Sequence, residues 1–167
     1  MKLSDAPTTE AEIEIAASAA FVWEIVADLQ TPSLTSPEFK GAEWLDGATA
    51  PAVGARFVGR NSHPAIGNWE TTSHVIKVDE PRELAYAVTD ADEPAAVWRY
   101  VITPTDHDTV VLKQIAQIGP GRSGLSLAID RMPEKEDRIV ARRLEEHQQS
   151  IRANLEKIKQ VAEGGER

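Results

Sequence analysis

The chain of 167 residues contains no cysteine. Without thiols there is no disulfide framework, no thiol nucleophile and no thiolate metal site. No apolar run approaches the length of a membrane-spanning helix, and the N-terminal segment MKLSDAPTTEAEIEIAAS lacks the apolar core of a signal peptide. We therefore expect a cytoplasmic protein without membrane insertion.

Positive charge is also scarce. The chain has 18 lysine and arginine residues against 27 aspartate and glutamate residues, which gives a formal net charge of -9. Nucleic acids and anionic membranes are bound by basic surfaces, so we expect neither as a partner. The length suits one domain with a sizeable core. We predict a flexible N-terminus over residues 1–9, a single domain over 10–163 and a flexible tail over 164–167.

Sequence motifs for metal or phosphate chemistry are missing as well. His63, His74 and His107 have no spacing to Asp, Glu or His that would seat a metal on one element. The segment GPGRSG precedes a helix but lacks the strand-turn-lysine context of a phosphate-binding loop. No G-x-S-x-G motif occurs. We therefore expect no metal and no cofactor.

Hydrophobic periodicity predicts mostly strands in the first two thirds of the chain. Residues 10–16 alternate between acidic and apolar side chains, as in a strand with one solvated face. Ser18 is placed to cap a helix in AAFVWEIVADL, and Pro32 and Pro37 leave room for at most one short helical turn after it. Short turn segments then separate successive strands, which favours antiparallel pairing. These strands are predicted at about 42–46, 54–61, 68–78, 83–89, 96–103 and 109–118.

The last third has helical periodicity. After Pro133, apolar residues recur every three or four positions as far as Glu163. A helix of about thirty residues is about 45 Å long and needs an apolar partner. The half-solvated sheet is the available partner. The sequence therefore predicts an α+β fold in which a curved antiparallel sheet wraps around a long C-terminal helix.

Six segments resemble a known superfamily over about residues 10–162: FVWEIVADL (21–29), SPEFKGAEWLDG (36–47), VGARFVGRN (53–61), WETTSHVIKVDEPRELAYAV (69–88), VWRYVITP (97–104) and SGLSLAIDRMPEKEDRIVARRLEEH (123–147). With these segments the chain resembles the START-like (SRPBCC) superfamily, in particular its bacterial polyketide cyclase/dehydrase-like branch. The resemblance implies a helix-grip fold with about seven strands and two short helices after the first strand. It also implies a deep cavity between sheet and helix for an apolar or aromatic small molecule. It identifies no reaction, because the family has no invariant catalytic signature.

The alternation of side chains along each strand predicts which residues line such a cavity. Trp98 and Tyr100 share the face that should point inward, and aromatic side chains with a polar edge suit a ligand pocket. The alternative is plain core filling. Gly59 either leaves room for a ligand or marks a bulge that curves the sheet, and we expect the bulge. In contrast, SPEFKGAEWLDG is interpreted as a structural corner. The further candidate ligand-binding residues on the strands are Phe57, Asn61, Trp69, Thr71 and Gln114.

Two candidates lie on the C-terminal helix. His147 is on the apolar stripe of that helix, with Arg143 one turn earlier. A polar group on a core-facing stripe is costly unless it is satisfied, so this half of the helix would face a solvated cavity. There His147 or Tyr100 would serve as an acid or base. The alternatives are that His147 bonds a neighbour or reaches solvent, and that ARRLEEH is an exposed, salt-bridged face.

Three functions fit this sequence. The first is binding of a hydrophobic or aromatic small molecule, lipid-like or polyketide-like, by a monomer or homodimer. The second is an enzyme of the polyketide cyclase/dehydrase type that uses an acid or base in the cavity. The third is a protein-interaction module. The sequence has no large exposed apolar stretch, which counts against the third.

Overall fold

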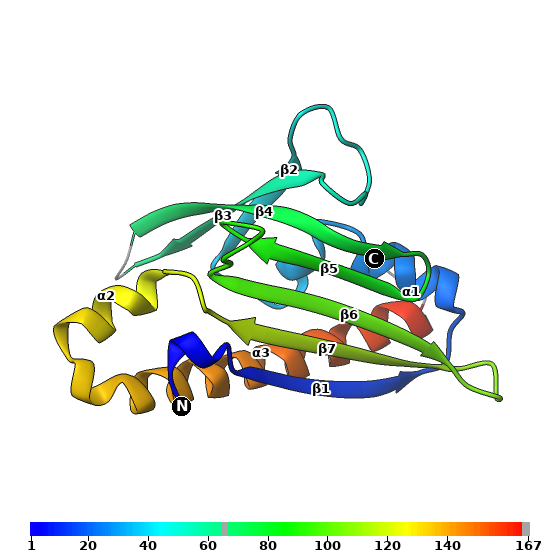
Figure 1. Cartoon of the computed structure of the whole chain (residues 1–167). Coiled ribbons are helices and arrows are strands. Elements are labelled where there is room, and N and C mark those ends of the chain that lie inside the picture. The colour runs from blue at the N-terminus through cyan, green and yellow to red at the C-terminus, as the bar shows by residue number, and fades with distance from the viewer. Residues whose placement is uncertain (65–66, 165–167) are drawn as a thin grey trace.

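The computed structural model describes residues 1–64 and 67–164 of the chain (Figure 1). The order of the elements is the one that the sequence predicts: the strands lie in the first two thirds of the chain, and the long helix comes last. The strands are β1 (Thr8–Ile15), β2 (Phe39–Trp44), β3 (Arg56–His63), β4 (Gly67–Asp79), β5 (Glu83–Val88), β6 (Ala96–Pro104) and β7 (Val110–Ile118). The α-helices are α1 (Ala19–Val26), α2 (Gly124–Arg131) and α3 (Glu136–Gly164), and the 3-10 helices are η1 (Leu3–Asp5), η2 (Thr31–Leu34) and η3 (Pro133–Lys135).

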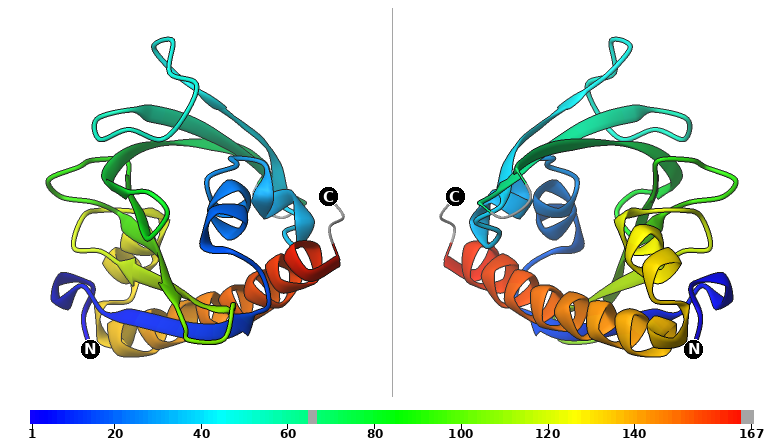
Figure 2. Two further views of the ribbon diagram at one scale, coloured as in Figure 1. Left: turned by 90° about the vertical axis from the view of Figure 1, so that its right-hand side faces the viewer. Right: turned by 90° about the vertical axis from the view of Figure 1, so that its left-hand side faces the viewer.

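One antiparallel sheet contains the seven strands in the order β1-β7-β6-β5-β4-β3-β2. Figure 2 shows the sheet curving around α3, with α1 inside the curve towards the C-terminal end of α3 and α2 beside its N-terminal end. This arrangement confirms the predicted α+β helix-grip fold. The curved sheet leaves one concave face towards α3 and one convex face towards solvent.

The main core lies between α3, α1 and the concave face. Helix α3 packs against β1 and β7, and its inward residues Ile151, Leu155 and Ile158 are at most 2% exposed. Strand residues such as Leu112 and Ile102 belong to the same buried cluster. Burial of this apolar stripe holds α3 in place, because a helix of this length gains most of its stability from packing.

Two bulges interrupt the sheet, and neither lies at the predicted position. The register shifts between Phe39 and Gly41 in β2 and between Val75 and Lys77 in β4. The expected bulge at Gly59 is wrong, because Gly59 pairs with Ala42 and Thr71 and neither ladder shifts its register at this residue. A Cβ atom added there would have Thr71 Oγ1, 4.0 Å away, as its one neighbour within 4 Å among the described residues. The glycine therefore leaves space on the concave face.

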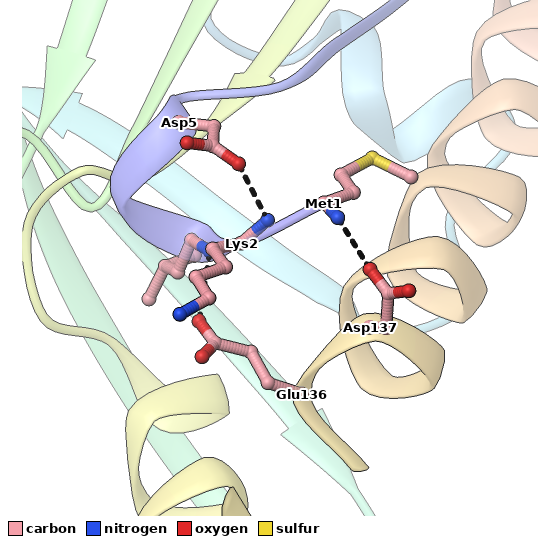
Figure 3. A network of polar contacts seen from close by, with 6 residues as sticks. Met1, Lys2, Asp5, Glu136 and Asp137 are labelled. Atoms are coloured by element: carbon pink, nitrogen blue, oxygen red, sulfur yellow. Dashed lines mark hydrogen bonds and ion pairs between the residues drawn. The ribbon is translucent and has the colours of Figure 1, made fainter. Parts of the chain in front are cut away.

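The N-terminal segment is attached to the start of α3 (Figure 3). The Met1 amino group pairs with the Asp137 carboxylate, and the Leu3 N–H donates a 3.0 Å hydrogen bond to Glu136 Oε2. The Leu3 side chain is buried in a second cluster with Ile118 and Val140. Strand β1 begins at Thr8, two residues before the predicted domain start. The flexibility of residues 1–9 stays a prediction, and residues 165–167 of the predicted tail lie outside the described residues.

Candidate functional site on the concave face

The strand register determines which side chains face α3. Successive residues of a strand point to opposite faces, and paired residues of neighbouring strands share a face. Tyr100 and Leu112, which belong to the core beneath α3, identify the concave set. The concave positions with described side chains are Thr9, Ala11, Ile13 and Ile15 of β1; Phe39, Ala42 and Trp44 of β2; Phe57, Gly59 and Asn61 of β3; Trp69, Thr71, Ser73, Val75 and Val78 of β4; Leu84, Tyr86 and Val88 of β5; Ala96, Trp98, Tyr100, Ile102 and Pro104 of β6; and Val110, Leu112, Gln114, Ala116 and Ile118 of β7.

An aromatic row crosses this face from β2 to α3. Trp44 and Phe57 meet edge to face with ring centroids 5.5 Å apart, and Phe57 and Tyr86 do so at 5.1 Å. Tyr86 pairs across the β5–β6 ladder with Trp98, whose ring lies 4.9 Å from that of His147, also edge to face. The four strand aromatics are only partly buried. The aromatic row of Trp44, Phe57, Tyr86 and Trp98 therefore keeps accessible apolar surface inside the curve of the sheet.

A buried polar cluster lies next to the aromatic row. The amide nitrogen Nδ2 of Asn154 donates to the Tyr100 hydroxyl at 2.8 Å and to Gln114 Oε1 at 2.9 Å. All three side chains are buried. The other amide atom, Asn154 Oδ1, is buried without a hydrogen-bond partner among the described residues. Tyr100 and Gln114 are thus bonded to a residue of α3, so the cluster joins the helix to the sheet.

Both tyrosines of the concave face stay neutral over a wide pH range. Burial raises the pKa of Tyr100 to about 12, and the Asn154 hydrogen bond partly opposes this. Burial also raises the pKa of Tyr86, with a smaller contribution from the nearby Tyr100. Within the described residues, the Tyr86 hydroxyl has no hydrogen-bond partner. It is therefore the less constrained of the two phenols.

His147 is 9% exposed and packs on the edge of Trp98. Burial lowers its pKa to about 4; the nearby Arg143 lowers it further, and Glu146 opposes the shift. No described residue forms a hydrogen bond with the ring. The imidazole is therefore neutral at pH 7. The alternative that it bonds a neighbour is wrong for the described part of the chain, and the alternative that it reaches solvent stays a prediction.

Arg143 lies apart from this group, although one helical turn separates it from His147. Its guanidinium is exposed and donates to Glu146 at 2.9 Å, and Arg142 pairs with the same carboxylate at 3.4 Å. This is the exposed, salt-bridged face that ARRLEEH also suggests. The structure therefore does not bring the predicted ligand residue Arg143 onto the concave face.

Asn61 and Trp69 lie at the rim of the sheet. They pair across β3 and β4, and Thr71 follows on the same face, opposite Gly59. An open pocket of about 380 Å³ is found here, lined by Lys40, Arg60, Asn61, Asn68, Trp69 and Glu70. The predicted ligand residues thus form three groups: Phe57 and Trp98 with His147, Tyr100 with Gln114, and the rim pair with Thr71. The deep cavity between sheet and helix stays a prediction.

Sequence reasoning missed three residues of this region. Tyr86 alternates with Leu84 and Val88 in ELAYAV, so the periodicity places it on the inward face. Trp44 belongs to the predicted corner, yet it contacts Phe57. Asn154 follows His147 by seven positions, two helical turns, and so shares its face. No sequence signal identifies the strand residues that Asn154 contacts.

Residues 1–64 and 67–164 contain neither a metal-binding cluster nor a membrane-spanning helix. No group of three or more His, Asp or Glu side chains described there is arranged to hold a metal ion. The side chain of His63, one of the histidines considered above, is not among the side chains that the structure describes. No helix in the same ranges is both long enough and apolar enough to cross a membrane.

Comparison with known proteins places this fold in a family. The sequence model described as polyketide cyclase/dehydrase and lipid transport matches residues 6–163. The chain belongs to this family. The comparison with curated proteins found no match.

Solved structures share the same architecture. A polyketide-cyclase-like protein from Corynebacterium glutamicum, Cgl2372, is 28% identical, with a TM-score of 0.70 over 96% of this chain and 91% of that one. DR_A0006 from Deinococcus radiodurans is 13% identical, with a TM-score of 0.64 over 95% and 99% of the two chains. The di-domain aromatase/cyclase StfQ from the steffimycin biosynthetic pathway is 16% identical, with a TM-score of 0.64 over 95% of this chain and 51% of StfQ. At their lower sequence identities, DR_A0006 and StfQ show only that the fold is shared.

Proposed function

We propose that this protein binds an apolar or aromatic small molecule against the concave face of its sheet. The observation that carries this proposal is the aromatic row, which is only partly buried although it lies inside the curve of the sheet. Elsewhere on the concave face, Ile102 and Leu112 are at most 2% exposed. The row therefore offers apolar surface on this face that a ligand would cover.

The side chains along the row match what a ring-containing ligand needs. Edge-to-face aromatic contacts contribute about 0.5–1.5 kcal/mol beyond area burial, and apolar burial contributes about 25 cal/mol per Å². The Tyr86 hydroxyl and the His147 ring form no hydrogen bond to other described residues, so both remain available to orient a ligand. The family's description, which includes lipid transport as well as cyclase and dehydrase activity, is compatible with such binding.

The protonation states favour binding over acid–base catalysis. A general acid or base works best when its pKa lies near the operating pH. The pKa values of about 4 for His147 and about 12 for Tyr100 are both far from neutral pH. The Tyr100 hydroxyl is moreover already bonded to Asn154. We therefore place binding ahead of a cyclase or dehydrase reaction that uses these two groups.

Fluorescence of N-phenyl-1-naphthylamine, an uncharged aromatic probe, tests the proposal. We expect saturable binding to the wild-type protein. Trp98→Ala should weaken it at least about tenfold, which corresponds to about 1.4 kcal/mol. The matched control is Val97→Ala, because Val97 is the neighbouring residue on the convex face of β6. Equal affinities for Trp98→Ala, Val97→Ala and the wild type would refute the proposed site, as would the absence of binding to the folded wild type.

A further inference from the structure

We infer that the concave site selects an uncharged ligand and discriminates against carboxylates, sulfonates and other anions. This inference rests on the proposed function and specifies the ligand class. It is carried by the distribution of charge between the two faces of the sheet.

The described concave positions contain no lysine, arginine, aspartate or glutamate. The charged residues of the strand ladders alternate onto the convex face, where several of them form ion pairs. Arg99 pairs with Glu83 there, and Lys113 lies 3.4 Å from Glu10. A ligand inside the curve therefore meets no cation from the described strand residues.

The helices add no charge to this face. The buried residues of α3 are apolar except for His147 and Asn154, and those of α1 are Val22, Trp23, Ile25 and Val26. The charged residue on α3 nearest in sequence to the site is Glu146, which pairs with Arg143 at the exposed surface. The buried residue of α2 is Ser126. No described helix thus supplies a counterion from its buried face.

Cations of the described residues are available at the rim. Lys40 is exposed beside the bulge of β2, and its ammonium donates to the Pro37 carbonyl at 3.2 Å. Arg60 pairs with Glu43 and lies 3.7 Å from Glu70. An anionic group buried along the aromatic row would therefore lose its hydration without gaining a counterion, which is strongly unfavourable. A neutral oxygen or nitrogen is better matched, because Tyr86 and His147 offer uncharged hydrogen-bonding groups.

Two probes with the same ring system separate charge from shape. N-phenyl-1-naphthylamine is uncharged, whereas 1-anilinonaphthalene-8-sulfonate carries a sulfonate on that ring system. Binding is measured in 1 M salt, where the Debye length of about 3 Å screens the overall negative charge of the protein. We expect the uncharged probe to bind at least about tenfold more tightly, since an unpaired buried charge is the more costly group.

A pair of variants tests whether charge is the cause. Thr71 lies on the concave face opposite Gly59, and its neighbour Thr72 lies on the convex face opposite Val58. Thr71→Lys and Thr72→Lys change the net charge equally. We expect Thr71→Lys to tighten sulfonate binding at least about tenfold relative to Thr72→Lys, because only the concave lysine provides a counterion. Equal sulfonate affinities for the two variants would overturn the inference.

The outcomes also separate this inference from the proposed function. If the sulfonate binds the wild type as tightly as the uncharged probe, competes with it and is lost in Trp98→Ala, the inference fails and the proposed function stands. If the folded wild type binds neither probe, both fail. Preferential binding of the uncharged probe, together with the Thr71→Lys gain, supports both.

Discussion

Replacement of His147 by phenylalanine removes the one titratable group that α3 buries against the sheet within the described ranges, and it keeps an aromatic ring beside Trp98. Burial is the main reason that the pKa of His147 falls to about 4 in the folded protein. In the unfolded chain the imidazole has its ordinary pKa of about 6.5. Between these two values the unfolded state binds a proton that the native state does not. The free energy of unfolding therefore falls as the pH is lowered through this range.

The size of the effect follows from the two pKa values. The full difference corresponds to about 3 kcal/mol, which is present above about pH 6.5 and lost by about pH 4. Between pH 7 and pH 5 the loss from this one group is about 2 kcal/mol. The lowered pKa values of Asp137 and Glu146 affect both proteins, and these carboxylates titrate below that interval.

Urea denaturation of the wild type and of His147→Phe at pH 7, 6 and 5 measures the difference. We expect the wild type to lose about 2 kcal/mol more than the variant across this interval. His147→Gln, which is polar but does not titrate in this range, should follow the phenylalanine variant. An overall destabilisation of either variant leaves the pH dependence interpretable. The same pH dependence in all three proteins would refute the assignment of a buried, neutral imidazole.

Two further stability predictions concern close contacts. Gly119 has φ +73°, and a Cβ atom there would lie 2.3 Å from the Leu3 carbonyl oxygen, so Gly119→Ala should cost more than about 2 kcal/mol in urea denaturation. Gly124→Ala, with no described atom within 4 Å of its Cβ, is the matched control; equal effects would contradict the reasoning. Asn154→Leu removes the amide that donates a hydrogen bond to Gln114 Oε1, and it should lower the free energy of unfolding by about 2–3 kcal/mol. Adding Gln114→Leu should recover part of this cost, and strictly additive losses would count against the cluster.

The fold could be predicted because its two periodicities are clear. Alternation separates the faces of β6 and places Tyr100 and Ile102 inward, and the apolar stripe of α3 ends where the structure ends the helix. Strand bounds were less accurate. Strand β2 runs from Phe39 to Trp44 rather than over 42–46, because the bulge beside Gly41 extends its pairing with β3. Local patterns carry no information about such a bulge.

The site was predicted less completely because it depends on how α3 lies on the sheet. His147 and Arg143 share a helical face by spacing, but the boundary between buried and exposed surface falls between them. The contact of Asn154 with Tyr100 joins residues 54 positions apart. Helical periodicity shows which α3 residues face inward, but it does not show which strand each of them meets.

The aromatic row as ligand site is tested most directly by the indole N–H signals of the four tryptophans in a ¹⁵N-labelled sample. Each signal is assigned by a single Trp→Phe variant and followed during titration with N-phenyl-1-naphthylamine. We predict that the Trp44 and Trp98 signals shift in a saturable way, while Trp23, buried in α1, shifts less. Saturable binding that shifts only Trp69 at the rim, or none of the four signals, would contradict the account.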